Sequence, residues 1–282
     1  MLAYLFPGQG SQCKGMGDGL FDLFRDHTRQ ADDILGYSIE AVCRGNAPQS
    51  LKQTQYTQPA LYVVNALMYL KLLADGEPLP DYVAGHSLGE YNALFAAGVF
   101  DFSTGLLLVK KRGELMAQTQ GGGMAAVIGL DPQDITDILQ AEQLTTITIA
   151  NYNSYQQTVL TGPEVDMDRA QTSLTARQCC SVIKLNVSGA FHSHYMSSAQ
   201  QAFETFISPM VMQTPKIPVI ANMNAKPYHP ATVKSNLIQH LVQPVQWVQT
   251  IEYLQTKPNI VYKEVGPGQV LTGLLNKIRA LA

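Results

Sequence analysis

The pentapeptide Gly-His-Ser-Leu-Gly at residues 85–89 lies between a short apolar run and a run of small residues with helical spacing. The apolar run at 82–84 predicts a buried strand, and the residues after the pentapeptide predict a helix that ends near Ala97. A G-x-S-x-G pattern in this context is typical of a very tight turn, which exposes the serine hydroxyl at the carboxyl end of a sheet. We therefore interpret Ser87 as a candidate nucleophile; the alternative is a serine that only caps the helix. Glu90 is expected to be an ordinary first-turn carboxylate favoured by the helix dipole.

Strands and helices alternate through the first part of the chain. Residues 2–6 predict a second buried strand. Helices are expected over 20–35, 59–74 and about 101–118. Pro59 is expected in the first turn of its helix, where a proline loses no hydrogen bond. This alternation indicates a mostly parallel sheet covered on both faces by helices, an α/β fold.

The middle of the chain follows a different order, and a glycine-rich joint at 121–123 precedes it. Strands are expected at 124–130, 145–150, 157–161 and 181–187, and helices at 132–141 and 164–176. The order βαββαβ is the split pattern of ferredoxin-like folds. After Ser188 the chain is expected to rejoin the larger body. The predicted division is 1–122 for the first part of a large α/β subdomain, 123–189 for a small ferredoxin-like subdomain and 190–282 for the second part of the large subdomain.

Charge and hydropathy exclude several classes of protein. The chain has 22 acidic and 19 basic side chains and a net charge of −3, whereas a nucleic-acid-binding surface needs an excess of positive charge. The most apolar stretch, residues 60–72, contains Asn65 and Lys71 and is too short to cross a bilayer. The N-terminus lacks the basic segment of a signal peptide. We therefore expect a cytoplasmic protein that binds neither nucleic acid nor a membrane.

The cysteines show no metal-binding or disulfide pattern. They are Cys13, Cys43, Cys179 and Cys180, and no CxxC pair occurs among them. Because structural zinc sites commonly use cysteine pairs at such short spacings, we expect no metal.

A serine nucleophile needs a general base, and histidine is the usual one. The chain has six histidines: His27, His86, His192, His194, His229 and His240. His192 and His194 follow a predicted strand and a Ser-Gly pair, and strand-end loops commonly carry catalytic groups. No carboxylate lies at a position typical of the third member of a catalytic triad. The residues alone therefore do not decide whether His192 or His194 is the base. They also do not identify the acid of a triad.

Two further features have more than one interpretation. The glycine-rich turn at 8–12 is similar to part of a dinucleotide fingerprint, but Cys13 replaces the third glycine. Its backbone N–H groups fit better as donors to an oxyanion. Arg112 lies on a predicted helix with apolar neighbours, where it is either an ordinary solvated side chain or a bidentate partner for a substrate carboxylate.

Eight short motifs follow one another along the chain. They lie at residues 8–12 (GQGSQ), 57–60 (TQPA), 85–91 (GHSLGEY), 112–113 (RG), 151–154 (NYNS), 190–193 (AFHS), 244–247 (PVQW) and 264–268 (EVGPG). Together they resemble the malonyl-CoA:acyl carrier protein transacylases, including the discrete acyltransferases that serve polyketide synthases in trans. The resemblance covers essentially the whole chain. It implies an α/β-hydrolase-like core into which the ferredoxin-like subdomain is inserted.

The resemblance also implies a set of roles. Ser87 would be the nucleophile and His192 the base. The N–H groups of Gln9 and Leu88 would form the oxyanion hole, and Arg112 would bind the malonyl carboxylate.

In this family a backbone carbonyl orients the catalytic histidine, and the resemblance places it near Gln246, which would explain the missing acid. An Ala-Phe-His run is typical of malonyl-preferring enzymes, in which Phe191 would occupy the space that an α-methyl group needs. The chain departs from the family pattern at Gly189, where histidine is common, and at Tyr155 and Gln156, which replace Pro-Gly. Both departures bear on the shape of the pocket.

The implied reaction has two steps and needs no metal or bound cofactor. Malonyl-CoA acylates Ser87, and the phosphopantetheine thiol of an acyl carrier protein then accepts the malonyl group, for polyketide or fatty-acid synthesis. Carrier proteins are typically acidic, so we expect a local basic patch, with Lys110, Lys111 and Lys184 as candidates. The alternatives are an acyl hydrolase that clears carrier proteins, a generic esterase and a non-enzymatic docking module; Arg112 favours the transferase.

Overall fold

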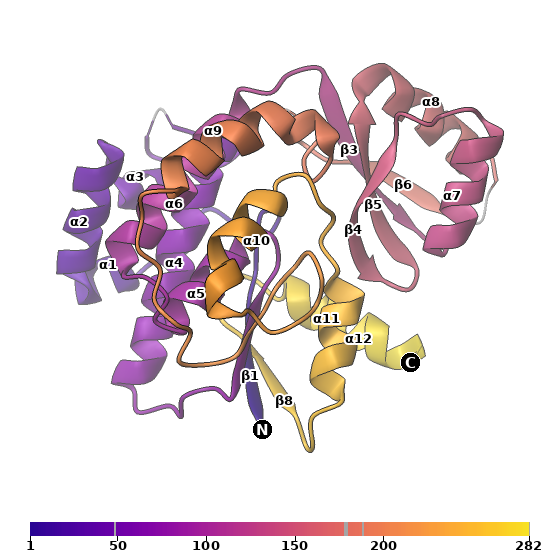
Figure 1. The fold of residues 1–282 in the computed structure, drawn as a ribbon. Helices are drawn as coiled ribbons and strands as arrows, with labels where there is room; N and C mark the ends of the chain where they lie inside the picture. The colour runs from indigo at the N-terminus through magenta and orange to yellow at the C-terminus, as the bar shows by residue number, and fades with distance from the viewer. Residues whose placement is uncertain (48, 178–179, 188, 282) are drawn as a thin grey trace.

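The computed structural model describes residues 1–47, 49–177, 180–187 and 189–281. The predictions that involve Cys179 and Ser188 fall outside these residues. The described part of the chain contains two four-stranded sheets, one parallel and one antiparallel (Figure 1). The predicted fold class, an α/β core with a separate ferredoxin-like unit, is confirmed. Among the described helices, none is both long and apolar enough to cross a membrane.

The parallel sheet has the strand order β7-β2-β1-β8. These strands are Val219–Ile220, Tyr82–Gly85, Leu2–Phe6 and Val261–Glu264. All three neighbouring pairs run parallel. The carboxyl ends of β1, β2 and β7 therefore lie next to one another at one edge, which is where open α/β sheets place their ligands.

Helices cover both faces of this sheet because side chains along a strand point alternately to opposite faces. Tyr4 and Phe6 of β1 pack in one core, together with helices on the first face. These are α2 (Arg25–Leu35), α3 (Ile39–Arg44), α4 (Thr54–Ala74), α5 (Gly89–Ala96), α6 (Phe102–Ala117), α9 (Ser197–Ile207) and α10 (Val233–Gln239). Ala3 and Leu5 pack on the other face against α11 (Trp247–Gln255) and α12 (Val270–Leu281).

Two helices differ from their predicted bounds. The helix expected over 20–35 is divided at Phe24 into α1 (Leu20–Leu23) and α2, and the Thr28 hydroxyl donates to the carbonyls of Phe21 and Phe24 at the junction. Helix α4 begins at Thr54, so Pro59 lies inside it and not in its first turn. The prediction started too late because residues 54–58 are mostly polar, yet Thr57 and Gln58 are buried where the helix meets the rest of the fold.

The antiparallel sheet has the strand order β4-β5-β3-β6, in which every neighbouring pair is antiparallel. The strands are Thr148–Ser154, Gln157–Pro163, Gly122–Ile128 and Ser181–Lys184. With α7 (Pro132–Ala141) after β3 and α8 (Glu164–Thr175) after β5, the chain order is the predicted βαββαβ. The second strand starts at 148 and not at 145, and the last ends at 184 and not at 187. The division at 122/123 and 189/190 stays a prediction.

The two faces of the antiparallel sheet have different partners. Ala125 and Val127 of β3 pack with α7 and α8 in a small core. The intervening residues Met124 and Ala126 face the other way, toward Met116 of α6 and the segment that follows β6. This second face therefore forms a wall against the large subdomain.

Backbone and side-chain hydrogen bonds join the two sheets. The Tyr152 N–H donates to the Val245 carbonyl at 2.9 Å, and the Val245 N–H donates to the Ala150 carbonyl at 2.8 Å. The hairpin tip adds a bond from the Tyr155 hydroxyl to Glu252 of α11, at 2.7 Å. The segment around 245 thus continues the edge of β4 and fixes the small sheet beside the parallel one.

Helix α6 begins at a side-chain cap that can be tested. Asp101 Oδ1 accepts the Thr104 N–H at 2.7 Å. Because loss of such a cap leaves a helix N–H unpaired, Asp101→Ala should lower the free energy of unfolding by about 1 kcal/mol. Asp101→Ser keeps a side-chain acceptor and should therefore retain most of the stability that the cap contributes. Urea denaturation of the three proteins measures the difference, and equal loss in both variants would contradict the capping role.

Candidate active site

A cavity of about 200 Å³ lies between the two sheets, beside the carboxyl end of β2. Both subdomains line it. The large subdomain contributes Gln9, Gln58, His86, Ser87, Met116, Phe191 and His192, and the small one contributes Met124, Ala126, Asn151, Asn153, Gln157 and Val159. The sequence-predicted residues around Ser87 and His192 are therefore brought together at one site.

Ser87 lies at the predicted turn between β2 and α5 and has a φ of +50°, which is unusual for a residue with a side chain. A methyl group on Gly89 would collide with the Phe6 carbonyl, and one on Gly85 would collide with the Gly89 backbone. Asn222, just after β7, holds the turn: its Oδ1 accepts the Ser87 N–H at 2.8 Å. Three adjacent strand ends thus fix the direction of the Ser87 hydroxyl.

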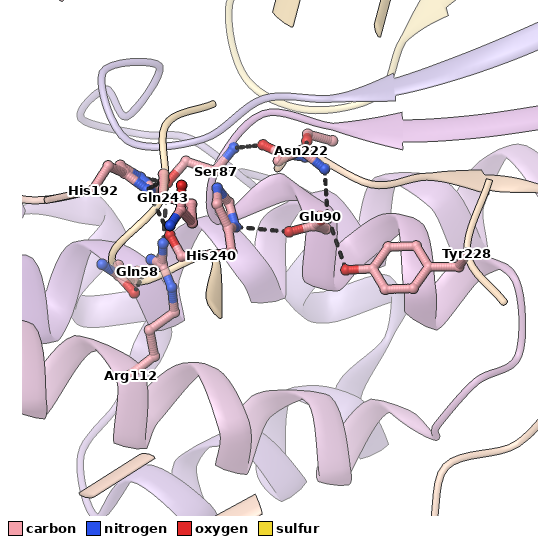
Figure 2. Close-up of polar contacts among 10 residues, drawn as sticks. Gln58, Ser87, Glu90, Arg112, His192, Asn222, Tyr228, His240 and Gln243 are labelled. Carbon is pink, nitrogen blue, oxygen red and sulfur yellow. Dashed lines mark hydrogen bonds and ion pairs between the residues drawn. The ribbon is translucent and has the colours of Figure 1, made fainter. Parts of the chain in front are cut away.

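His192 is oriented as a base toward this hydroxyl (Figure 2). Its Nε2 lies 2.8 Å from Ser87 Oγ, while its Nδ1 lies 3.0 Å from the His240 carbonyl and 3.2 Å from the Gln243 carbonyl. Carbonyl oxygens only accept, so Nδ1 carries the proton and Nε2 presents its lone pair to Ser87. Burial, with the nearby His240 and Arg112, holds the pKa of His192 well below its usual value. The imidazole is therefore neutral and able to take a proton.

The orienting carbonyl was expected near Gln246, but the Gln246 carbonyl itself makes no described contact with His192. This carbonyl accepts the N–H and the hydroxyl of Thr250 in the first turn of α11, at 2.9 and 2.8 Å. His240 and Gln243, which precede the helix, supply the carbonyls instead.

The other histidine of the loop, His194, does not face the serine. It is exposed at the start of a short 3₁₀ turn, His194–Met196, and its ring packs on Tyr195. His86 is half-buried against Trp247, and its Nε2 lies 2.8 Å from Asn153 Oδ1. Burial lowers the pKa of His86 to about 4, so this histidine is a neutral structural link between the subdomains.

Two backbone N–H groups are available to an oxyanion. Neither the Gln9 N–H nor the Leu88 N–H donates a hydrogen bond to any described residue. The two loops lie against each other, since a methyl group on Gly8 would lie 3.5 Å from the Leu88 nitrogen. Leu88 is also the N-cap of α5, where helix N–H groups favour negative charge. The assignment of these two N–H groups to an oxyanion hole stays a prediction.

Arg112 is a fully buried cation whose described partners are all neutral. Its side chain extends from α6 to the serine; one terminal nitrogen donates to Gln58 Oε1 at 2.8 Å and the other to Ser87 Oγ at 3.1 Å. The Tyr91 ring lies 5.7 Å from the guanidinium carbon. Burial lowers the pKa of Arg112 from its ordinary value. Because a buried unpaired charge is strongly unfavourable, this guanidinium is suited to bind an anionic ligand beside Ser87.

Phe191 forms part of the apolar wall of the cavity, packed with Met116, Met124 and Met196. Gly189 matters for this wall, because a side chain there would collide with Thr119 and approach the Phe191 ring at 3.1 Å. The second departure from the family pattern has no such effect: Tyr155 bonds to Glu252 outside the cavity.

Five residues of the site were not predicted from the sequence: Gln58, Glu90, Asn222, His240 and Gln243. Gln58 lies in the TQPA motif but had no assigned role, and Asn222 follows a two-residue strand that leaves no periodic signal. Glu90, expected to be an ordinary first-turn carboxylate, is 1% exposed and contacts His240. Two sequence features could have indicated two of them. Gln58 lies in a polar motif next to a predicted helix, and Glu90 is an acid three residues after the serine. No cluster of metal-binding side chains occurs among the described residues.

Comparison with known proteins gives a consistent result. Residues 3–278 match the family model of the acyl transferase domain. The polyketide biosynthesis malonyl CoA-acyl carrier protein transacylase PksC of Bacillus subtilis is 51% identical over 280 residues, 99% of this chain and 97% of that protein.

Solved structures agree. Malonyl CoA-acyl carrier protein transacylase from Burkholderia pseudomallei superposes with a TM-score of 0.97 at 46% identity, covering 100% of this chain and 99% of that one. A malonyl-transacylase in complex with a type II PKS acyl-carrier protein superposes with a TM-score of 0.90 at 32% identity, covering 98% and 92%. Because the family match and the relatives both span nearly the whole chain, this protein belongs to the acyl transferase domain family.

Proposed function

We propose that this enzyme transfers a malonyl group from malonyl-CoA to the phosphopantetheine thiol of an acyl carrier protein, through a malonyl ester of Ser87. The observation that carries the proposal is the buried Arg112 guanidinium, which lies 3.1 Å from Ser87 Oγ and forms no ion pair with a described residue. A malonyl thioester places a carboxylate two bonds from its reacting carbonyl carbon. A group of this size can reach the serine and the arginine together.

In the first half-reaction His192 Nε2 takes the Ser87 hydroxyl proton while Oγ attacks the thioester carbonyl carbon. The carbonyl oxygen becomes an oxyanion, which the N–H groups of Gln9 and Leu88 stabilise. Collapse of this intermediate breaks the carbon–sulfur bond. The CoA sulfur leaves with the proton that His192 holds.

The second half-reaction runs through the same groups in reverse. His192 takes the proton of the carrier thiol, whose sulfur attacks the ester carbon, and the proton returns to Ser87 Oγ as the ester bond breaks. The His240 and Gln243 carbonyls support the cationic imidazole in both steps, because they accept its Nδ1 proton. They would take the place of a triad carboxylate.

An acyl hydrolase would use the same serine and histidine but has no need of a buried cation beside them. Arg112 therefore favours a transferase that selects a carboxylated acyl group. Phe191 supports the unsubstituted malonyl group over its α-methyl derivative, because its ring belongs to a closely packed apolar wall.

We infer that the carrier serves polyketide synthesis and meets the enzyme in the cytoplasm as a separate protein. The 51% identity to the Bacillus subtilis polyketide transacylase supports this pathway. Of the candidate basic residues, Lys184 is paired with Glu164 and Asp168 at 3.2 and 3.1 Å. Lys110 donates to the Ile34 carbonyl at 2.8 Å and Lys111 lies 5.8 Å from the Phe206 ring centre, but neither is paired with a described carboxylate, so these two lysines of α6 stay the candidates for contact with an acidic carrier.

The nucleophile can be tested by mass. Incubation with malonyl-CoA should add one malonyl group to the intact protein, and Ser87→Ala should abolish the addition because the attacking oxygen is gone. His229→Ala, in an exposed turn, is the matched control and should acylate as the wild type does. Acylation of Ser87→Ala at the wild-type rate would show that another residue is the nucleophile.

Arg112 can be tested by substrate choice. Loss of one partner of a buried ion pair costs about 3–5 kcal/mol, so Arg112→Ala should reduce malonyl transfer by about 10²–10³-fold at 1.4 kcal/mol per tenfold. Transfer from acetyl-CoA, which lacks the carboxylate, should change little. The ratio of malonyl to acetyl transfer to one carrier protein is the measurement, with a thermal melt to check folding. An unchanged ratio in a folded variant would favour the hydrolase.

The base predicts a pH profile. Catalysis needs neutral His192, and because burial lowers its pKa well below the usual value of about 6.5, the neutral form persists as pH falls through that value. The kcat/KM for acylation should therefore be level from pH 8 to about 6 and fall only at more acidic pH. Circular dichroism at each pH checks the fold. A midpoint at or above the usual histidine pKa would contradict a buried neutral base.

A further inference from the structure

Glu90 is a buried carboxylate that the reaction described above does not use. It lies in the first turn of α5, three residues after Ser87, and is 1% exposed. Two donors and one histidine contact it. Oε1 accepts the Asn222 N–H at 2.8 Å and the Tyr228 hydroxyl at 2.9 Å, while Oε2 lies 2.8 Å from His240 Nδ1 and accepts no hydrogen bond from the described residues (Figure 2). Burying a carboxylate away from water costs free energy. We therefore expect the contacts of Glu90 to have a role that offsets this cost.

One of these contacts leads to the nucleophile. Asn222 donates its N–H to Glu90 and accepts the Ser87 N–H with its side-chain oxygen, at 2.8 Å in both cases. The same side chain donates to the Gly85 carbonyl at the start of the turn. Glu90 therefore holds Asn222 in place, and Asn222 in turn holds the strained backbone of Ser87.

Another contact leads to the base. His240 is 2% exposed, its Nδ1 faces Glu90, and its Nε2 has no partner among the described residues. Its ring lies 4.6 Å from the His192 ring, tilted by 33°. The backbone carbonyl of the same residue accepts the His192 Nδ1 proton at 3.0 Å. Glu90 is thus the one polar contact of the His240 side chain in the described structure, and it lies on the same residue whose carbonyl holds His192.

We propose that Glu90 is a positioning residue for both reacting groups, through Asn222 toward Ser87 and through His240 toward His192. In a catalytic triad the acid orients the histidine by direct contact. Here Glu90 has the same orienting function, but it acts through His240. This inference rests on the proposed acyl transfer. Neither residue touches the substrate, so the pair acts on the rate of the chemical step and not on substrate binding.

The substitution Glu90→Gln separates the connection through Asn222 to Ser87 from the connection through His240 to His192. A glutamine keeps an oxygen for the Asn222 N–H and the Tyr228 hydroxyl, but presents an NH₂ group to His240 Nδ1. His240 must then change tautomer or turn away, and its carbonyl shifts with it. Burial and Glu90 raise the pKa of Tyr228 well above its ordinary value, so this hydroxyl stays a donor in the variant. The other titratable groups that face the pair are His192, His86, Tyr91 and Arg112.

The kinetic test compares Glu90→Gln, His240→Leu and the double variant as malonyl transferases. Each single change should lower kcat by about ten- to a hundredfold, since small misplacement of reacting groups has effects of this size, and leave KM within about twofold. The double variant should be no slower than the slower single variant, because the two residues act as a unit. It should also melt at a higher temperature than His240→Leu, in which the buried carboxylate has lost a partner.

Glu264→Gln is the matched control. This partly buried carboxylate accepts the N–H groups of Leu271 and Thr272 at the start of α12 and has no contact with the reacting groups. It should lower stability without changing kcat per folded molecule. Additive kcat losses in the double variant, or a kcat in Glu90→Gln equal to that of Glu264→Gln, would overturn the proposal.

A second readout needs no substrate. Nitrogen-15 NMR of histidine-labelled protein should show His192 as the Nδ1–H tautomer in the wild type and Glu264→Gln, and a mixture of tautomers in Glu90→Gln. An unchanged tautomer in Glu90→Gln would overturn the proposal. If the wild type does not accept a malonyl group, the proposed function fails, while the NMR result still decides whether Glu90 positions His192.

Discussion

The strained turn at Ser87 depends on three parallel strands that end at the same edge of one sheet. A positive φ at a residue with a side chain costs about 1–3 kcal/mol and persists only where surrounding contacts require it. Here the β1 loop packs against the turn through Gly8 and Gly89, and the residue after β7, Asn222, accepts the Ser87 N–H. The direction of the nucleophile is therefore a property of the sheet, and the pentapeptide only makes it sterically possible.

The base depends on the joint between the subdomains. His192 comes from the segment that returns from the small sheet, and its φ of +57° shows that it too is held in an unfavourable conformation. The segment that holds it, residues 240–243, continues directly into Val245, which pairs with β4. One stretch of chain thus orients the base and attaches the small sheet, whose second face forms the outer wall of the acyl cavity. A change in how the subdomains pack would alter the base and the pocket together.

Two buried charges of opposite sign lie on adjacent helices and have separate partners. Glu90 on α5 accepts hydrogen bonds from Asn222 and Tyr228 and lies beside His240, whereas Arg112 on α6 has only neutral partners and an unpaired Nε among the described residues. If Glu90 and Arg112 were paired with each other, Glu90 could not hold Asn222 and His240, and Arg112 could not bind an anionic ligand. Because they are separate, the carboxylate is held by groups of the fold, while the guanidinium can still pair with an anionic ligand. In the proposed reaction a neutral acyl group would leave this buried charge unpaired, so the burial of Arg112 would itself favour a carboxylated substrate.

The sequence by itself determined the features that neighbouring residues control. Glycine sterics and a strand–helix boundary define the turn at Ser87, and alternation of apolar residues defines the βαββαβ order, because both act over a few residues. The tertiary structure decided which carbonyl orients His192: every residue has a carbonyl, so no side chain marks His240 or Gln243 for this role. It also decided that Thr57 and Gln58 extend α4, and that Glu90, Asn222 and His240 meet, since hydrogen bonds between segments more than a hundred residues apart leave no local pattern.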